Sequence, residues 1–265
     1  MKLTKMKIYS WNMLFCNRKL DRAFEFIAQS DFDIFCLQEV PEKFLERLKI
    51  LPYHSAYVPE SNLIFRGNRE TIFNLVLSKY PIAHSEVISL KHYTLELPWR
   101  SRFFARCMFL LRIWPEGLGN RHALYADIEI PDRGIVRIFN LHLPLMNPHI
   151  RAEEFEHTLL QKNPLQPTIV CGDFNIIEKS PTIVLNWLLG GRVSDALLYR
   201  RERTYIEKRF ISYELANALR GTITHSLSRS QLDHILVSNS FSIKTAEVIS
   251  DCTGSDHHPI RAEIC

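Results

Sequence analysis

The sequence predicts an α/β fold built on a mixed β-sheet, and two observations support this prediction. First, short apolar runs rich in β-branched and aromatic residues alternate along the chain with segments whose apolar residues recur at helical spacing. Second, residues 123–130 and 135–141 are two such runs joined by Pro-Asp-Arg-Gly, the pattern of an antiparallel hairpin. Alternating strands and helices form layers, and the hairpin makes part of the sheet antiparallel.

Strands are expected where an apolar run is long enough to be buried but too short for a helix. Such runs occur from one end of the sequence to the other, so the sheet draws on the whole chain. We expect strands at residues 7–10, 34–37, 75–77, 123–130, 136–141, 168–171 and 234–237.

Helices are expected between these strands. In the first, Leu20, Phe24 and Ile27 recur at helical spacing, and Asp21 favours the positive end of the helix. Further helices are expected at residues 41–51, 149–160 and 181–189. Two basic segments, residues 91–119 and 199–220, are not assigned and are interpreted as insertions near the active site. The alternative for residues 91–119 is a strand with a solvated basic face.

The composition indicates one soluble globular domain covering residues 1–265. The sequence has no internal repeat, no low-complexity tract and no Gly/Ser-rich linker. Lys and Arg number 33 and Asp and Glu 29, so the formal net charge of +4 is only mildly basic. A charge of this size is compatible with an anionic partner but cannot identify one.

Cysteine usage and hydropathy predict a cytoplasmic protein. The six cysteines form no CxxC pair, and Cys36 and Cys171 lie in apolar runs where free thiols are expected, which fits a reducing compartment. No signal peptide is expected, because the first residues lead directly into a strand. No transmembrane helix is expected either, since Arg106 and Arg112 interrupt the most apolar segment, residues 103–114.

Polar side chains follow directly on several predicted strands. Asn12 follows the first strand and Glu39 the second, and His142 and Asp173 each come after a later strand. Gly172 allows a tight turn that projects Asp173, with Asn175 close behind it. Each residue alone has an ordinary explanation: a solvated strand end, an Asx turn or a satisfied core histidine.

The C-terminal part adds an acid at the start of a strand and a cluster of acid and imidazole. Asp233 precedes the strand at residues 234–237, and Asp256 stands beside His257 and His258. Together with the earlier strand ends, these residues offer carboxylates, carboxamides and imidazoles, but no cysteine suited to a thiolate site. Oxygen ligands favour Mg²⁺, Mn²⁺ or Ca²⁺ over structural zinc.

The order of these motifs resembles the endonuclease/exonuclease/phosphatase superfamily across nearly the entire chain. The motifs are Trp-Asn, Gln-Glu, Asn-x-His-Leu, Gly-Asp-Phe-Asn, Leu-Asp-His-Ile and Ser-Asp-His-His-Pro. The resemblance implies a four-layer α/β sandwich, in which two mixed, largely antiparallel sheets pack face to face with helices outside. It also implies that the active site lies at one end of the sheets.

The resemblance implies a metal site and a catalytic group. Glu39 would be the principal ligand of Mg²⁺ or Mn²⁺, Asn12 would hold the metal or the substrate phosphate, and Asp256 would add to a metal position. Asp173 would position or deprotonate the attacking water. Asn175 would donate a hydrogen bond to a phosphoryl oxygen or to the nucleophile.

Three further roles follow from the same resemblance. Asp233 would orient the imidazole of His257, and His142 would bind a phosphoryl oxygen or assist the leaving group. His142 and Leu14 also indicate the branch of the superfamily. The pattern of the abasic-site endonucleases has a tyrosine where this chain has His142 and an acid where it has Leu14. The abasic-site branch is therefore disfavoured, and the pattern is similar to deoxyribonucleases, sphingomyelinases and inositol-polyphosphate phosphatases.

These observations predict a monomeric metal-dependent hydrolase of phosphodiester or phosphomonoester bonds. Nucleic acid is the substrate expected first, because Arg102 and Arg106 are interleaved with aromatic residues. A phospholipid headgroup is the alternative, since Trp99 and Phe103 could meet a membrane surface. A third class is a binding protein that kept the fold and lost catalysis, which is disfavoured because every expected polar position is filled.

Overall fold

Two six-stranded sheets form the centre of the computed structural model. The structure describes residues 5–65, 67–90, 98–111, 121–145, 147–178, 184–188, 190–194 and 201–265. The first sheet has the strand order β11-β12-β1-β2-β4-β3. Its strands are β1 (Met6–Asn12), β2 (Ile34–Pro41), β3 (His54–Phe65), β4 (Asn68–Ser78), β11 (Ile243–Val248) and β12 (Ile260–Ile264).

The second sheet has the strand order β5-β6-β7-β8-β10-β9. Its strands are β5 (Ile82–Ser89), β6 (His122–Ile130), β7 (Gly134–His142), β8 (Thr168–Asp173), β9 (Leu215–Asn217) and β10 (Asp233–Ser238). In each sheet two neighbouring strands are parallel, β1 with β2 and β7 with β8, while the other described pairs are antiparallel.

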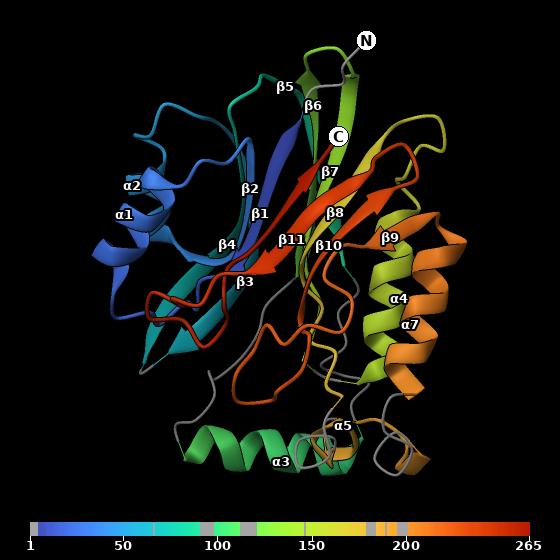
Figure 1. The fold of residues 1–265 in the computed structure, drawn as a ribbon. Coiled ribbons are helices and arrows are strands. Elements are labelled where there is room, and N and C mark those ends of the chain that lie inside the picture. The colour runs from blue at the N-terminus through green and yellow to red at the C-terminus, as the bar shows by residue number, and fades with distance from the viewer. Residues whose placement is uncertain are drawn as a thin grey trace.

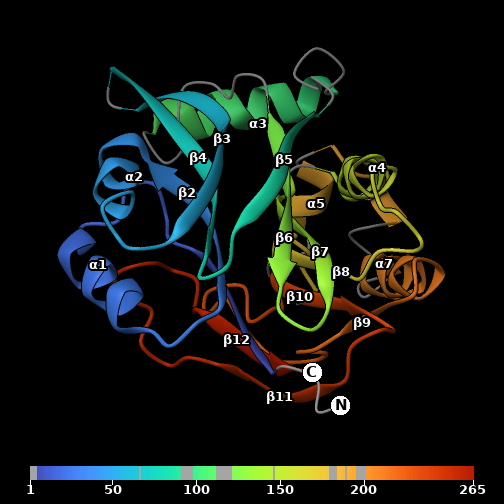
Figure 2. The same cartoon turned by 90° about the horizontal axis from the view of Figure 1, so that it is seen from above.

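Each parallel pair is joined by a helix on the outer face of its sheet, because a parallel connection needs a crossover. Helix α1 (Leu20–Gln29) connects β1 to β2, and α4 (Pro148–Leu159) connects β7 to β8. Helix α2 (Glu42–Leu48) lies beside α1, and α7 (Arg201–Ser212) lies beside α4 (Figures 1 and 2). The result is helix, sheet, sheet, helix, as the family resemblance implied.

Two helices lie outside these layers, at one end of the sandwich. They are α3 (Trp99–Leu110) and α5 (Val184–Leu188), which contact each other (Figure 1). The strands β1 and β7 both run toward this end, while the C-terminus lies at the other end beside the start of β1. No helix in the described ranges is long and apolar enough to cross a bilayer.

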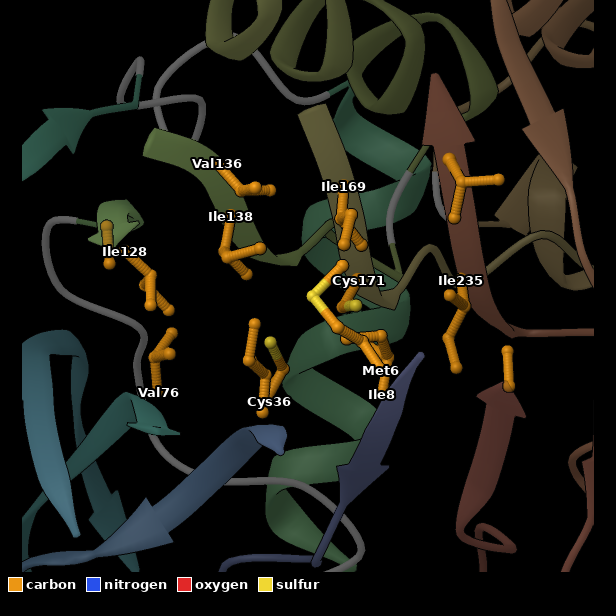
Figure 3. Packing of buried hydrophobic residues seen from close by; sticks show 14 of the residues in the cluster. Met6, Ile8, Cys36, Val76, Ile128, Val136, Ile138, Ile169, Cys171 and Ile235 are labelled. Atoms are coloured by element: carbon orange, nitrogen blue, oxygen red, sulfur yellow. The ribbon is translucent and has the colours of Figure 1, made fainter. Parts of the chain in front are cut away.

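The largest apolar cluster lies between the two sheets. Figure 3 shows side chains of the first sheet, such as Ile8 and Cys36, facing those of the second, such as Ile138 and Cys171. All four are fully buried. Two further clusters lie under the outer helices, one beneath α1 and α2 and one beneath α4 and α7. Burial of apolar surface on both faces of both sheets therefore holds the layers together.

The structure confirms the predicted fold class and extends most of the predicted strands. It also contains strands that the sequence did not indicate: β3, β5, β9, β11 and β12. In β5 and β11 most side chains are at least partly exposed, so these strands lack the apolar run that marks a buried one.

Two interpretations of unassigned segments were wrong. The described part of residues 91–119 is the helix α3, not a strand with a basic face, while residues 91–97 and 112–119 lie outside the described part. From residue 201 onward, the segment 199–220 forms α7 and β9, which belong to the second sheet and its helical layer, so it is not an insertion. Of the helix expected at 181–189, the structure describes 184–188.

Candidate active site

The polar strand ends of both sheets meet at the α3 end of the sandwich. In the second sheet, Asp173 is the register partner of both His142 and Asp233, so the three side chains start on adjacent strands. Asn12, at the end of β1, crosses from the first sheet. Its amide nitrogen donates to Glu39 Oε1 and to Asp173 Oδ2, both at 3.0 Å. One amide therefore links the carboxylates of the two sheets.

Local backbone geometry places the two central carboxylates. Glu39 has a positive φ of 54°, at a point where the pairing of β2 with β4 shifts register. Such an irregularity redirects a side chain at the edge of a sheet. Gly172 has a φ of 143°, and a Cβ there would lie 1.8 Å from the Leu141 carbonyl oxygen. Only glycine lets β8 come this close to β7 and bring Asp173 beside His142.

Glu39 is a largely buried carboxylate with few donors, and its side chain is 14% exposed. Its second oxygen accepts a hydrogen bond from the Phe15 backbone nitrogen at 3.0 Å. Burial raises the pKa of Glu39, and the neighbouring Glu60 carboxylate adds to the rise, while His142 opposes it. A raised pKa means that the charged form is poorly compensated by the protein alone. A cation bound at Glu39 would supply the missing compensation.

Asp256 offers a second oxygen ligand on the same side of the cluster. Its Oδ1 is buried and has no hydrogen-bond partner among the described residues. Glu39 and Asp256 both lie close enough to the Cys16 thiol to change its pKa. Burial raises the pKa of this thiol, and the negative charges of both carboxylates raise it further. The orphaned oxygen, the under-compensated Glu39 and the lack of a thiolate ligand among the described residues of the cluster fit a hard divalent cation such as Mg²⁺ or Mn²⁺.

His225 holds the other oxygen of Asp256. The Ser228 backbone nitrogen donates to His225 Nδ1 at 3.1 Å, so in the neutral ring the proton is on Nε2. That Nε2 lies 3.4 Å from Asp256 Oδ2, and the centre of the imidazole lies 4.7 Å from that of His257, with the two ring planes tilted by 48°. The geometry makes His225 a donor that orients Asp256 and leaves Oδ1 free.

His257 lies between two buried carboxylates. Its Nδ1 is 2.9 Å from Asp233 Oδ2, and its Nε2 is 3.5 Å from Asp173 Oδ2. Burial lowers the pKa of His257, but Asp233 and then Asp173 outweigh this effect and raise the pKa to about 10. In Asp173 burial is likewise outweighed, here by His257 and His142, and its pKa is lowered. Asp173 is therefore ionised at neutral pH.

His142 is held by a buried acid of β3. Its Nδ1 lies 2.7 Å from Glu60 Oε1, while Nε2 faces Asp173 Oδ2 at 3.6 Å. Burial lowers the pKa of His142, but Glu60, followed by Asp173 and Glu39, raises it to about 9. Asn175 Nδ2 lies 3.1 Å from His142 Nε2 and donates to the Leu143 carbonyl at 2.9 Å. The amide of Asn175 and the imidazole of His142 thus converge on one spot.

The structure places the expected residues in two groups. Eight polar residues form one connected cluster at the strand ends: Asn12, Glu39, His142, Asp173, Asn175, Asp233, Asp256 and His257. Arg102 and Arg106 lie apart from it on α3, where both are exposed. In the described part of the chain neither forms a hydrogen bond or an ion pair with the cluster.

Sequence reasoning missed Glu60 and His225. Glu60 lies in the middle of a strand, in Pro59-Glu60-Ser61, where an acid usually faces solvent, yet it is only 2% exposed. The signal was present, because Pro59 marks a break in the pairing of β3 with β4. His225 follows Thr224 in a polar stretch without apolar periodicity, so its sequence context carried no signal.

Solved structures with the same architecture come from several organisms. An endonuclease/exonuclease/phosphatase from Beutenbergia cavernae superposes with a TM-score of 0.69 at 17% identity, covering 99% of this chain and 72% of that one. The catalytic domain of human Nocturnin with bound sulfate gives 0.64 at 17% identity and coverages of 98% and 93%. A Bacteroides thetaiotaomicron mannosyl-6-phosphatase gives 0.59 at 18%, with coverages of 98% and 99%. At these identities the likeness shows the fold alone.

Sequence comparison gives the family. No curated protein sequence matches this one significantly. The sequence profile described as the Endonuclease/Exonuclease/phosphatase family, however, matches residues 9–257, a span that begins in β1 and ends at His257. Because this match covers nearly the whole chain and the two-sheet architecture agrees with it, the chain belongs to the endonuclease/exonuclease/phosphatase family.

Proposed function

We propose that the chain is a divalent-metal-dependent hydrolase of phosphate esters. One observation carries this proposal: the Asp173 carboxylate is shared by an amide and two imidazoles, from Asn12, His142 and His257, beside the under-compensated Glu39. Such a constellation combines a fixed anion, donors for a phosphoryl group and oxygen ligands for a cation. Those are the groups that phosphoester hydrolysis by water requires.

Glu39, Asp256 and the carboxamide of Asn12 would hold the cation. When bound, Mg²⁺ or Mn²⁺ would supply positive charge that offsets the charge growing on the phosphoryl group in the transition state. The protein contributes the geometry: Phe15 and Asn12 fix the two oxygens of Glu39, and His225 fixes one oxygen of Asp256. The remaining surface of both carboxylates is left for the ion.

The other residues would bind and orient the reactants. Asp173 is ionised and faces the cluster, so it would accept a hydrogen bond from the attacking water and position that water for in-line attack. His142 Nε2 and Asn175 Nδ2 lie 3.1 Å apart, so one phosphoryl oxygen lying beside the pair would accept a hydrogen bond from each. His257, oriented by Asp233, contributes a further positive charge at the same centre.

Two substrate classes fit this proposal. A phosphodiester of nucleic acid is the first expected from the sequence, and the exposed Arg102 and Arg106 favour it. A phospholipid headgroup is the second, and the exposed aromatic side chains of α3 favour it. The free cysteines support the further proposal of a reducing, cytoplasmic location. We also propose a monomer, because the described residues of one chain supply the whole cluster at the strand ends.

A turnover screen tests the proposal directly. The substrates are plasmid DNA, RNA, phosphoinositides, sphingomyelin and a chromogenic bis-aryl phosphodiester, each with Mg²⁺, with Mn²⁺ and with excess chelator. We expect at least one substrate to be hydrolysed with metal and none with chelator. Full activity in chelator, or no activity on any phosphate ester, would contradict the proposal.

A further inference from the structure

Helix α3 presents large apolar side chains to solvent. Trp99 is 75% exposed, Phe103 65% and Leu110 77%, and Leu111 directly after the helix is 64% exposed. Residues 99, 103 and 110 are spaced four and seven apart, so they lie on one face of the helix. Single exposed apolar residues are ordinary, but a contiguous group on one helix face marks an interaction surface.

The same face is basic. Arg102 and Arg106 are exposed and lie beside Phe103 along the helix, and the helix sequence WRSRFFARCMFL contains no acidic residue. The opposite side faces the protein, where Ser101 is 1% exposed. We name the surface formed by Trp99, Arg102, Phe103, Arg106 and Leu110 the α3 face.

Contacts on the inner side hold α3 at the active-site end. Arg100 Nε donates to the Trp187 carbonyl at 3.0 Å, and the guanidinium lies 5.2 Å from the centre of the Trp187 ring. Next to α5, the Gly190 carbonyl accepts from Asn147, the N-cap of α4. Because α4 follows β7, this chain of contacts connects α3 to the strand that ends in His142.

We propose that the α3 face docks on the surface of a lipid bilayer that carries anionic headgroups. Exposed Trp, Phe and Leu insert at the boundary between headgroups and acyl chains, and Arg side chains pair with anionic headgroups. At 12 residues the helix is about 18 Å long and cannot span a bilayer, so it would lie in the plane of the surface.

Nucleic acid fits the α3 face less well. A base can stack on Trp99 or Phe103, but Leu110 and Leu111 have no ring for stacking. Bound nucleic acid would therefore leave these two leucines exposed to solvent. Docking on a bilayer uses all of these side chains and both arginines. It would also bring lipid headgroups to the cluster at the strand ends, an extension that rests on the proposed phosphoesterase function.

Binding to vesicles tests docking without requiring turnover. The full chain is mixed with phosphatidylcholine vesicles that do or do not contain phosphatidylserine, and the bound fraction is measured by sedimentation. We expect binding only to the anionic vesicles. The double variants W99S/F103S and R102E/R106E should each weaken it by about tenfold or more, because one removes the inserting rings and the other reverses the charge.

Matched controls separate the α3 face from general surface properties. K208E/K244E replaces two exposed basic residues on α7 and β11, so it has the same net charge as R102E/R106E. L160S/L165S removes exposed leucines at the opposite end of the second sheet, where Leu160 is 73% and Leu165 94% exposed. Both controls should bind anionic vesicles like the wild type. An equal loss in either control would overturn the proposal.

Tryptophan fluorescence gives an independent readout of position. If Trp99 enters the bilayer interface, anionic vesicles shift the emission to the blue, and W99F abolishes this shift while the protein still binds. A shift that persists in W99F, or no shift in the wild type, would contradict docking through α3.

The outcomes separate this inference from the proposed function. Failure of the wild type to bind anionic vesicles overturns the inference, whereas hydrolysis of a soluble chromogenic diester would still support the phosphoesterase. If duplex or single-stranded DNA binds instead and R102E/R106E abolishes that binding, the α3 face is a nucleic-acid surface and the membrane inference is wrong. Vesicle binding without hydrolysis of any phosphate ester would sustain the inference and contradict the proposed function.

Discussion

At the scale of single residues, the candidate site is a balance of charges around Asp173. Two imidazoles whose pKa values are raised, to about 9 for His142 and about 10 for His257, face one carboxylate whose pKa is lowered. Each imidazole has its own acid behind it, Glu60 for His142 and Asp233 for His257. The arrangement fixes charge and orientation before any substrate arrives, which is what electrostatic preorganisation requires.

Removing a central carboxylate should lower turnover strongly while the fold persists. We expect Glu39→Gln and Asp173→Asn each to lower kcat by about two orders of magnitude or more, the scale of losing a metal ligand or a positioned proton acceptor. Turnover of the best substrate from the screen measures this. Glu46→Gln, which affects only an exposed pair with Lys49, is the control and should be unaffected. Variants that lose the circular-dichroism spectrum of the wild type would indicate a structural role instead.

Asp233 and His257 should act as one unit, because their side chains are in direct contact in the buried site. We expect Asp233→Asn to lower kcat strongly and His257→Ala to lower it at least as much. The double variant should be little worse than His257→Ala, since cooperating groups are not additive. Multiplying losses in the double variant would show that the two residues act separately, and His258 would then be tested as the partner.

His225 should affect metal binding more than catalysis. Because it holds Asp256 through one oxygen, His225→Leu is expected to raise the Mg²⁺ concentration for half-maximal activity about tenfold, with kcat at saturating Mg²⁺ nearly unchanged. His225→Gln retains a donor and should restore most of the affinity. His157→Leu, an exposed histidine of α4, serves as the control. A fall in kcat that saturating Mg²⁺ does not reverse would contradict this role.

At the scale of elements, each functional side chain depends on how a strand or helix is held by its neighbour. Helix α7 is tied to β10 through Arg203, which lies 2.6 Å from His234 Nε2, while His234 Nδ1 lies 2.9 Å from the Leu232 carbonyl. The ring therefore donates from Nδ1 and accepts at Nε2, which is the neutral form. Burial and Arg203 hold the pKa of His234 well below its usual value.

His234 should make folding sensitive to acid. The folded state excludes the proton that the unfolded chain binds below about pH 6.5, so this stability is present above that pH and is lost as the pH falls. Between pH 7 and pH 5 the wild type should lose about 2 kcal/mol more of its unfolding free energy than His234→Gln does. Urea denaturation at the two pH values measures the difference. Parallel losses in both proteins would contradict the assignment.

At the scale of the whole molecule, a buried amide joins the two sheets behind the site. Asn140 of β7 donates to the Leu37 and Leu75 carbonyls of the first sheet at 2.9 and 3.0 Å, and it accepts from Gln38 at 2.7 Å. It is fully buried. These bonds set the distance between the sheets, and therefore the distance between Asn12 on one sheet and Asp173 on the other.

Removing this bridge should destabilise the whole sandwich. Asn140→Ala removes the bonds to two buried carbonyls and leaves the Gln38 amide with only its longer contact to Ser10 Oγ at 3.3 Å, and each lost buried hydrogen bond costs about 1–3 kcal/mol. We expect the unfolding free energy to fall by about 3 kcal/mol, with an unchanged dependence on urea concentration. Asn163→Ala, which removes an exposed turn bond to Leu165, should cost far less. Equal losses of unfolding free energy in the two variants would show that the Asn140 bonds do not stabilise the packing of the two sheets.

Much of the fold and the candidate site could be predicted because both depend on patterns of a few neighbouring residues in the sequence. Buried strands such as β8 consist of apolar residues throughout, and polar residues placed directly after them have few structural explanations. Edge strands such as β11 could not be predicted, because half-exposed segments carry little hydrophobic signal. The helix α3 escaped prediction because its exposed face is apolar and basic, which conceals the usual polar face of a surface helix.

The sequence by itself determined the α/β class, the buried strands with the helices between them, and the residue types that gather at the strand ends, because burial and turn chemistry act over a few neighbouring residues. Only the tertiary structure decided that Glu60 holds His142, that His225 holds Asp256 and that the α3 face points to solvent. These contacts join residues from separate elements, such as β3 with β7. Their partners are fixed by how the two sheets pack, and no local pattern in the chain encodes that packing.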